Sequence, residues 1–197
     1  MMTDIKILST DAGKLQIPTC DILRYSGCRE SKDERLCTLA RDCAEELRGH
    51  LSLKAVYAEV PVKFHANEAD FGFFKTESAS LRKFLGGDCT AAVFAATVGL
   101  GADRLIAKYS SVLPSRAVML DGVATAAIEC FCDYICREVF SVAEQARFSP
   151  GYGDLPLSMQ PEILNCLNAH LHIGLAMTDS MLLTPTKSVT AIVKIKD

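Results

Sequence analysis

A loop rich in glycine and proline carries the residues best suited to hold a ligand. The segment RFSPGYGD, from Arg147 to Asp154, combines two glycines and a proline with Arg, Tyr and Asp. Glycine has no side chain in the way, so backbone N–H groups can approach a ligand closely there. Arg147 can hold a carboxylate through two parallel hydrogen bonds. The alternative interpretation is a helix-ending turn that leaves Arg147 on the surface.

A single carboxylate lies on the helix predicted before this loop. Four residues follow one another at steps of four, three and four, and so share one helical face: Thr125, Glu129, Cys132 and Cys136. The face consists of small side chains and the Glu129 carboxylate, which can receive a ligand ammonium or a positively charged sulfonium. The alternative is a partly exposed glutamate at the edge of a buried face.

Nine cysteines raise the question of a metal or redox site. Cys130, Cys132 and Cys136 are close in sequence, but the chain contains no Cys-x-x-Cys pair. On a helix, Cys130 points about 200° away from Cys132, so the three sulfurs cannot meet at one metal ion. The other cysteines have the pattern of small apolar packing residues. We therefore predict no metal site.

One glycine-containing junction resembles a phosphate-binding turn only in outline. The segment TVGLGAD, from Thr97 to Asp103, leads from a predicted strand into a predicted helix, where phosphates can bind. It lacks the Gly-x-Gly-x-x-Gly and Gly-Lys-Ser/Thr patterns. A tight turn is the favoured interpretation.

The composition excludes several classes of protein. The 197 residues are 49% apolar and 23% charged, as in globular domains, and 24 acidic residues against 21 basic ones give a net charge of −3. No basic field is present to hold nucleic acid. The longest stretch free of charged residues in the apolar middle of the chain, 89–102, is too short to span a membrane. The start MMTDIKILST is no secretion signal, so we expect a cytoplasmic protein with reduced thiols.

The elements that must position the loop follow from hydrophobic periodicity. Strands are predicted over five segments: 1–9, 53–62 (with Pro61 marking an edge or an end), 71–74, 89–98 and 188–195. Helices are predicted over six segments: from Pro18 to about Gly27, 31–51, 78–84 (capped by Ser78 or Ser80), 102–112, 115–145 and 160–167. Segment 89–98 is nearly continuously apolar and predicts a buried central strand, whereas 188–195 alternates and predicts a half-buried one.

These elements mix without a regular strand–helix alternation. The fold class is therefore predicted to be α+β, with a mainly antiparallel sheet, a long central helix and flanking helices. The chain length fits a single domain over residues 1–197.

Several ordered motifs resemble the activation domain of cobalamin-dependent methionine synthase, and more closely the short stand-alone proteins built from it. The strongest match is RFSPGY at 147–152, which is similar to the family's Arg-x-x-x-Gly-Tyr motif for S-adenosylmethionine. Further matches follow in the family's order: ILRYSG at 22–27, ATVG at 96–99, GDLPL at 153–157, IGLAMTDS at 173–180 and PTKSVT at 185–190. The resemblance is firmest over 88–197 and implies the fold of that domain.

The resemblance implies a role in methionine biosynthesis. Such domains bind S-adenosylmethionine and present its methyl group to inactive cob(II)alamin, which one electron must reduce. This chain carries no cobalamin module, so the corrinoid would come on a partner chain, a cobalamin-dependent methyltransferase such as methionine synthase. The electron would come from a flavodoxin-type donor. The chain would then be one part of a methyltransferase system, and not a complete active site.

The resemblance also implies which residues bind the cofactor: Glu129, Arg147, Phe148, Pro150, Gly151 and Tyr152. Arg147 would grip the methionine carboxylate, and Glu129 would lie near the positive end of the cofactor. Gly151 would let the loop backbone approach the ligand, and Tyr152 would line the pocket. No residue is predicted to be catalytic, because reduced cobalt is itself a strong nucleophile and the protein need only position the reactants.

Two departures from the family pattern support an alternative. The chain ends at Asp197, where the family's domain continues and carries a tyrosine pair near the cofactor. The family's N-terminal aspartate has no clear match. The alternative is a non-catalytic docking or regulatory partner of a corrinoid protein that has lost cofactor binding. A cysteine-based metal or redox protein is the third hypothesis.

Overall fold

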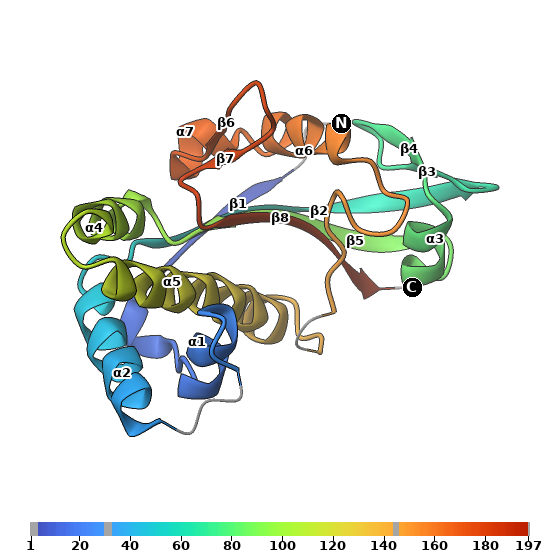
Figure 1. Cartoon of the computed structure of the whole chain (residues 1–197). Coiled ribbons are helices and arrows are strands. Elements are labelled where there is room, and N and C mark those ends of the chain that lie inside the picture. The colour runs from blue at the N-terminus through green and yellow to red at the C-terminus, as the bar shows by residue number, and fades with distance from the viewer. Residues whose placement is uncertain (1–3, 30–32, 144–145, 197) are drawn as a thin grey trace.

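The computed structural model describes residues 4–29, 33–143 and 146–196. One curved antiparallel sheet lies between two layers of helices (Figure 1). Its centre is β5 (Cys89–Thr97), which pairs with β2 (Leu53–His65) on one side and β8 (Ser188–Lys196) on the other. β1 (Ile5–Thr10) pairs with the first half of β2. The predicted α+β class with a mainly antiparallel sheet is confirmed.

Four short strands complete the architecture. β3 (Glu68–Asp70) and β4 (Lys75–Glu77) extend the sheet beyond the far end of β2. β6 (Ala176–Met177) and β7 (Leu183–Thr184) form a separate two-stranded ribbon that precedes β8. The ribbon lies beside α6 and α7, above the sheet in Figure 1.

The central strand is buried on both faces, as its apolar run predicts. Successive side chains of a strand point to opposite faces, so β5 contributes to two separate cores. Ala92, Phe94 and Ala96 pack into one core, and their neighbours Ala91, Val93 and Ala95 pack into the other. β8 was predicted to be half-buried, and this is wrong at its middle, because helices also cover Ile192 on the second face.

Four helices cover one face of the sheet: α1 (Thr19–Tyr25), α2 (Glu34–Arg48), α4 (Leu100–Ser110) and α5 (Pro114–Tyr134). A short 3-10 turn, η1 (Ala12–Lys14), leads from β1 toward α1. α5 crosses the sheet as the central helix of this layer (Figure 1). Helix α1 packs on α5 so closely that a Cβ atom at Gly122 would lie 2.0 Å from Ser26 Oγ.

Three helices belong to the second core: α3 (Ala79–Leu85), α6 (Gln160–Cys166) and α7 (Ala169–Ile173). The 3-10 turn η3 (Leu157–Met159) leads directly into α6. The capping prediction for α3 is confirmed for Ser78, whose Oγ accepts from the Leu81 amide at 3.0 Å. Within the described parts of the chain, no helix is long and apolar enough to cross a membrane.

The predicted helix 115–145 ends earlier than its periodicity indicates. α5 stops at Tyr134 and continues as one wider π-type turn, η2 (Ile135–Val139). This turn brings Phe140 against Tyr57 and Phe94, with ring centroids 5.2 and 6.1 Å away. Aromatic packing on the sheet therefore overrides the helical period here. The predicted end at Gln145 lies outside the described residues.

The predicted strand 71–74 is wrong. The segment is a tight connection between β3 and β4, in which Gly72 has φ of +81° and its amide donates to Asp70 Oδ1 at 2.8 Å. The phenylalanines of this segment pack their rings on one another and form no pleated strand: Phe71 and Phe74 stack with centroids 4.5 Å apart. Pro61 does not end its strand either: β2 runs on to His65, and Pro61 lies where only β5 pairs with it.

Other predicted boundaries differ from the observed ones at the element ends. The first strand is observed as β1, and residues 1–3 of the prediction lie outside the described residues. The helix predicted over 31–51 is α2, and residues 31–32 likewise lie outside. At the Thr97–Asp103 junction, only Val98 and Gly99 connect β5 to α4, which starts at Leu100; Gly99 has φ of +85°.

Candidate functional site

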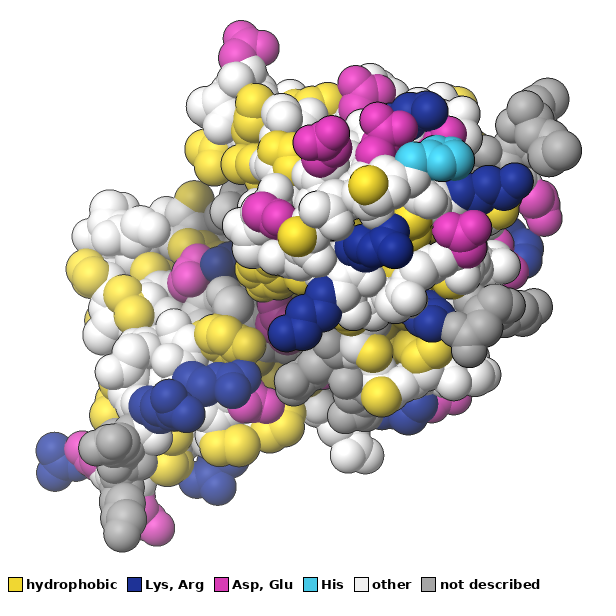
Figure 2. Space-filling model, turned by 90° about the vertical axis from the view of Figure 1, so that its right-hand side faces the viewer, with side chains coloured by type: hydrophobic (Ala, Val, Ile, Leu, Met, Phe, Trp, Pro, Cys, Tyr) yellow, Lys and Arg dark blue, Asp and Glu magenta, His cyan; other side chains and the backbone are white. Residues whose placement is uncertain are grey.

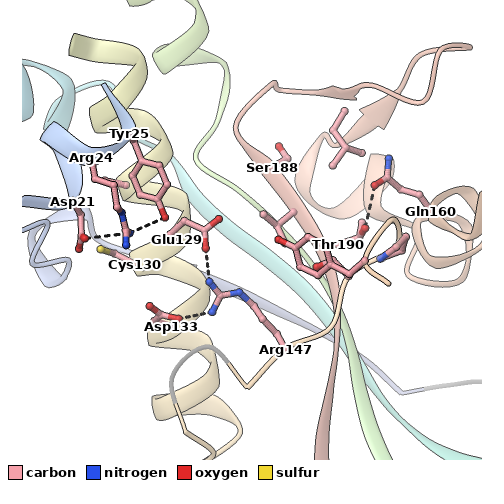
Figure 3. Close-up of a pocket in the computed structure, with 16 residues that line it drawn as sticks. Asp21, Arg24, Tyr25, Glu129, Cys130, Asp133, Arg147, Gln160, Ser188 and Thr190 are labelled. Carbon is pink, nitrogen blue, oxygen red and sulfur yellow. Dashed lines mark hydrogen bonds and ion pairs between the residues drawn. The ribbon is translucent and has the colours of Figure 1, made fainter. Parts of the chain in front are cut away.

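A polar cavity of about 530 Å³ lies where the first helical layer meets the edge of the sheet. Its walls come from segments far apart in sequence: α1, the second half of α5, the loop after η2, and the start of β8 (Figure 3). The volume falls in the range of roughly 300–1,000 Å³ that is usual for small-molecule sites. The space-filling view from the side of α3 shows both signs of charge interspersed on that face (Figure 2).

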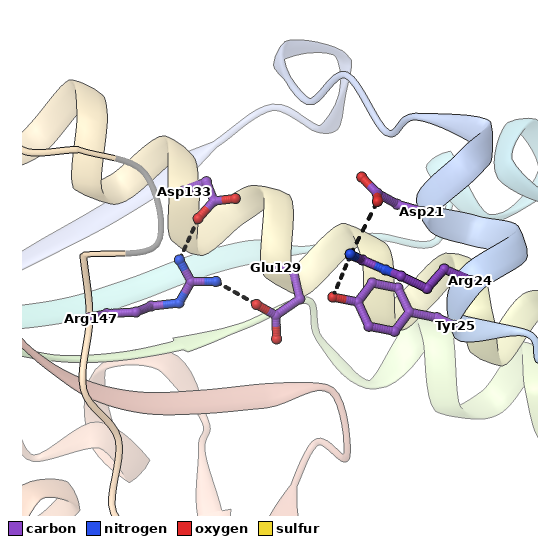
Figure 4. A network of polar contacts seen from close by, with 6 residues as sticks. All are labelled: Asp21, Arg24, Tyr25, Glu129, Asp133 and Arg147. Carbon is purple, nitrogen blue, oxygen red and sulfur yellow. Dashed lines mark hydrogen bonds and ion pairs between the residues drawn. The ribbon is translucent and has the colours of Figure 1, made fainter. Parts of the chain in front are cut away.

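Arg147 is the central cation of the cavity. Its guanidinium donates to Glu129 and to Asp133, which lie one turn apart on α5 (Figure 4). Only 10% of the Arg147 side chain is exposed, against 36% for Glu129. A buried guanidinium needs paired carboxylates to offset its lost hydration. The two acidic residues therefore hold Arg147 across the gap between the loop and α5.

Helix α1 forms the wall opposite Arg147. Arg24 donates to the Tyr25 hydroxyl at 3.0 Å and pairs with Asp21 at 3.1 Å. Figure 4 shows the Tyr25 hydroxyl directed toward the space beside Glu129. Partial burial, and then the Glu129 charge, raise the pKa of Tyr25. Tyr25 therefore remains a neutral hydrogen-bonding group at physiological pH.

The loop backbone is fixed to the sheet immediately after Arg147. Phe148 forms an isolated antiparallel bridge with Ile192 of β8, with both N–H···O distances at 2.8 Å. Extended backbone alternates its side chains, so Phe148 points away from the cavity while Arg147 and Ser149 face it. The Phe148 ring packs in the second core, 5.4 Å from the ring of Phe84.

The glycine turn closes the loop against α3. Gly151, at φ of +91°, donates to the Leu155 carbonyl at 2.9 Å. Asp154 accepts from Ser78 Oγ at 2.5 Å and from the Ala79 amide at 2.8 Å, at the start of α3. The Ser78 hydroxyl, and then the α3 amides, hold the pKa of Asp154 well below its usual range. The loop is thus tied to β8 at one end and to α3 at the other.

The start of β8 supplies the third wall. Ser188, Val189 and Thr190 line the cavity. The buried Gln160 of α6 accepts from Thr190 at 3.3 Å and donates to the Met181 carbonyl at 3.1 Å. This pair satisfies polar groups at the floor of the cavity and links it to the second helical layer (Figure 3).

The structure brings four of the six sequence-predicted site residues together. Arg147, Glu129, Pro150 and Tyr152 line the cavity. Phe148 and Gly151 are not among the lining residues, and they act on the loop's shape through the bridge to Ile192 and the turn to Leu155. The four residues of the Glu129 face are divided: Cys132 and Cys136 are fully buried in the core, and only Glu129 lines the cavity.

The sequence reasoning missed the contribution of α1. Asp21 lies in the cavity wall, although the sequence shows no clear match to the N-terminal aspartate of the methionine synthase activation domains. The ILRYSG segment was the available clue, since Asp21 immediately precedes it. Asp133 was also missed, although it lies four residues after Glu129 and hence on the same helical face.

The cysteines play different parts. Cys130 lines the cavity and Cys132 points into the core, in keeping with the helical geometry predicted for them. Burial raises the pKa of the Cys132 thiol. In the described parts of the chain, no three His, Cys, Asp or Glu side chains are grouped so as to hold a metal ion.

The cavity combines three carboxylates with two guanidinium groups, so its lining has a net charge of −1. Such a set can hold a zwitterion, whose carboxylate faces an arginine and whose ammonium faces a carboxylate. One negative charge remains to attract an additional cation on the same ligand.

The fold and the cavity define the class of protein: an α+β domain whose curved antiparallel sheet and long helix enclose a polar cleft. Among solved structures, the chain is similar to a crystal structure of the MetH reactivation domain bound to AdoHcy. The match has a TM-score of 0.77 and 17% sequence identity, and it covers 98% of this chain and 78% of that one. No family model and no curated protein matches the sequence. The two proteins share a fold.

Proposed function

We propose that the cleft binds S-adenosylmethionine and that the chain serves as a reactivation subunit for a cobalamin-dependent methyltransferase, with methionine synthase as the first candidate. The observation that carries the proposal is the position of Arg147, at the centre of a cavity that also contains Glu129, Pro150 and Tyr152. The shared fold with a reactivation domain bound to AdoHcy, the demethylated form of S-adenosylmethionine, supports it.

The residues present fit the chemistry of this ligand. S-adenosylmethionine carries an α-carboxylate, an α-ammonium and a sulfonium, so its net charge is opposite to that of the cavity lining. In this proposal Arg147 binds the carboxylate, which displaces one of its two internal carboxylate partners. Glu129 is the more exposed of those partners and faces Tyr25, so it is assigned to the positive end of the ligand. Asp21 is then assigned to contact the polar groups of the ligand that lie on the α1 side of the cleft.

The loop contributes rigidity. Its backbone is fixed by the bridge from Phe148 to Ile192 and by the capping of α3 by Asp154, and Pro150 stiffens the segment between them. A loop that is ordered before binding loses less entropy when the ligand arrives. When bound, S-adenosylmethionine supplies an electrophilic methyl group to a reduced corrinoid held by the partner chain. The chain itself would orient the ligand, leave one side of the cleft open to the partner and provide no general base.

Calorimetric titration with S-adenosylmethionine tests the proposal. The wild-type protein is expected to bind saturably, and Arg147→Ala is expected to lose about ten- to a hundredfold in affinity, the effect of removing a charge-assisted hydrogen bond. Arg137→Ala, which removes an exposed arginine from η2, is the matched control and should bind as the wild type does. Equal affinities for the wild type and Arg147→Ala would contradict the assignment of the site.

A second candidate function is a docking or regulatory partner of a corrinoid protein that binds no cofactor. The observation that favours it is that both terminal nitrogens of Arg147 already have carboxylate partners within the chain. Such a site is satisfied without a ligand. The same titration, repeated in the presence of a cobalamin-dependent methyltransferase, separates the candidates. Binding only with that partner supports a shared site, and association without S-adenosylmethionine supports the docking function.

A further inference from the structure

One lysine side chain joins two walls of the cleft without lining it. The Lys187 Nζ atom pairs with Asp121 Oδ1 at 2.8 Å and donates to Thr125 Oγ1 at 2.9 Å, both on α5. Only 15% of the Lys187 side chain is exposed, although lysine usually extends into water. Its backbone is fixed at the same time, because the Lys187 carbonyl accepts from the Val98 amide at 3.1 Å.

The two ends of this contact lie directly beside cavity-lining residues. Thr125 precedes Ala126 in the α5 wall and lies one helical turn before Glu129. Lys187 precedes Ser188, the first residue of the β8 wall. Ser188 is oriented by its hydroxyl, which donates to the Pro185 carbonyl at 2.6 Å and lies in hydrogen-bond contact with the Thr97 hydroxyl at 2.8 Å. The α5 and β8 walls face each other across the cavity in Figure 3.

Ligand binding would disturb the contacts of Arg147 but not those of Lys187. Arg147 joins its loop to α5 at the position where a ligand carboxylate would compete for it. Lys187 joins β8 to α5 outside the cavity, where no ligand has to displace it. The Lys187 contact can therefore stay closed while a ligand opens the contact between Arg147 and Glu129.

We propose that Lys187 is a positioning residue, which holds the start of β8 at a fixed distance from α5 and so sets the width of the ligand cleft. The inference rests on the proposed binding of S-adenosylmethionine. Without the Lys187 ammonium, Ser188–Thr190 would be able to move relative to Glu129. The ligand could then not contact the β8 wall and the α5 wall at the same time. Arginine is the conservative replacement, because it is long enough to reach both Asp121 and Thr125 and keeps the charge.

The test compares Lys187→Met and Lys187→Arg with Lys63→Met, which removes an exposed strand lysine of β2. Each variant is titrated with S-adenosylmethionine well below its own thermal midpoint, so that a loss of overall stability does not lower the affinity. Lys187→Met is expected to bind about tenfold more weakly, while the other two stay within about threefold of the wild type. Asp121→Asn, which alters the partner instead, is expected to weaken binding in the same direction.

A second measurement needs no ligand. Hydrogen exchange of the backbone amides of residues 188–190 is expected to be faster in Lys187→Met than in the wild type, and unchanged in Lys63→Met. Affinity and exchange both unchanged in Lys187→Met would overturn the proposal, as would a loss that Lys187→Arg shares in full. If the wild type binds no S-adenosylmethionine, the proposed function fails. The exchange measurement then decides separately whether Lys187 fixes β8 to α5.

Discussion

Arg147 and Glu129, eighteen residues apart in the chain, form an ion pair across the cleft between the glycine loop and α5. The pair brings together the two residues that the sequence marks as a carboxylate-binding cation and a cation-binding carboxylate. Within the chain, each is the other's charged partner. A ligand that carries both charges can replace this contact by two contacts of the same kind.

The first prediction concerns the Glu129 carboxylate. Glu129→Gln is expected to weaken S-adenosylmethionine binding about fivefold, which corresponds to roughly 1 kcal/mol of lost charge attraction at a partly exposed site. Binding of AdoHcy should change little, because its sulfur is uncharged. Competitive titration of both ligands measures the ratio, and Glu138→Gln on the exposed face of η2 is the control. An equal loss for both ligands would show that Glu129 acts through Arg147 and not on the sulfonium.

The second prediction concerns the cost of removing the Arg147 guanidinium from between Glu129 and Asp133. Arg147→Met is expected to lower the free energy of unfolding by about 1–3 kcal/mol, less than for a fully buried pair because Glu129 and Asp133 are partly exposed. Urea denaturation measures it. Adding Glu129→Gln to Arg147→Met should restore part of the loss by removing the carboxylate charge that Arg147 paired. A double variant less stable than Arg147→Met would argue against this electrostatic origin.

The third prediction is a pH dependence at the far end of the loop. The Asp154 pKa is lowered by the Ser78 hydroxyl and the α3 amides, so the folded state prefers the ionised carboxylate. Its contribution is fully present above the unfolded pKa of about 4 and is lost as the pH falls through the lower folded value. The unfolding free energies of the wild type and Asp154→Asn, measured from pH 7 to pH 3, should therefore begin to approach each other below about pH 4. A constant difference over this range would show that the ionised form is not what holds the loop.

The fourth prediction tests how α1 is held in the cleft wall. Gly122→Ala places a methyl group 2.0 Å from Ser26 Oγ and 3.0 Å from the Ile22 carbonyl, so α1 must shift. Overpacking of this kind is expected to cost about 1–3 kcal/mol of stability. It should also weaken S-adenosylmethionine binding by moving Asp21 and Tyr25. Gly49→Ala is the control, since its new methyl group would meet only the Glu46 carbonyl at 4.0 Å. Thermal unfolding and titration of the two variants check both effects, and similar behaviour of the pair would contradict this role of Gly122.

Local sequence patterns predicted the type of most elements. The uninterrupted apolar run of β5, the amphipathic period of α2 and the Ser78 cap of α3 are short-range properties, and each is observed. The failures arise where distant contacts override the local pattern. Phenylalanines 71, 73 and 74 pack on one another in a tight connection, and Phe140 draws the end of the central helix onto the sheet.

The same division holds for the candidate site. The loop from Arg147 to Tyr152 and the helical position of Glu129 could be predicted from the sequence. Both follow from residue types and spacings within a short segment of the chain. Asp21 is marked only by its place before the ILRYSG segment, and nothing near Lys187 in the sequence indicates what its side chain contacts.

The sequence by itself determined the α+β composition, the glycine loop and the chemistry that its residues can perform. Only the tertiary structure decided that α1, α5 and β8 enclose one cavity, that Asp133 shares Arg147 with Glu129, and that Lys187 joins two of its walls. The reason is physical. Propensity and periodicity act over a few residues along the chain, whereas ion pairs and cavity walls depend on how the sheet brings distant segments together.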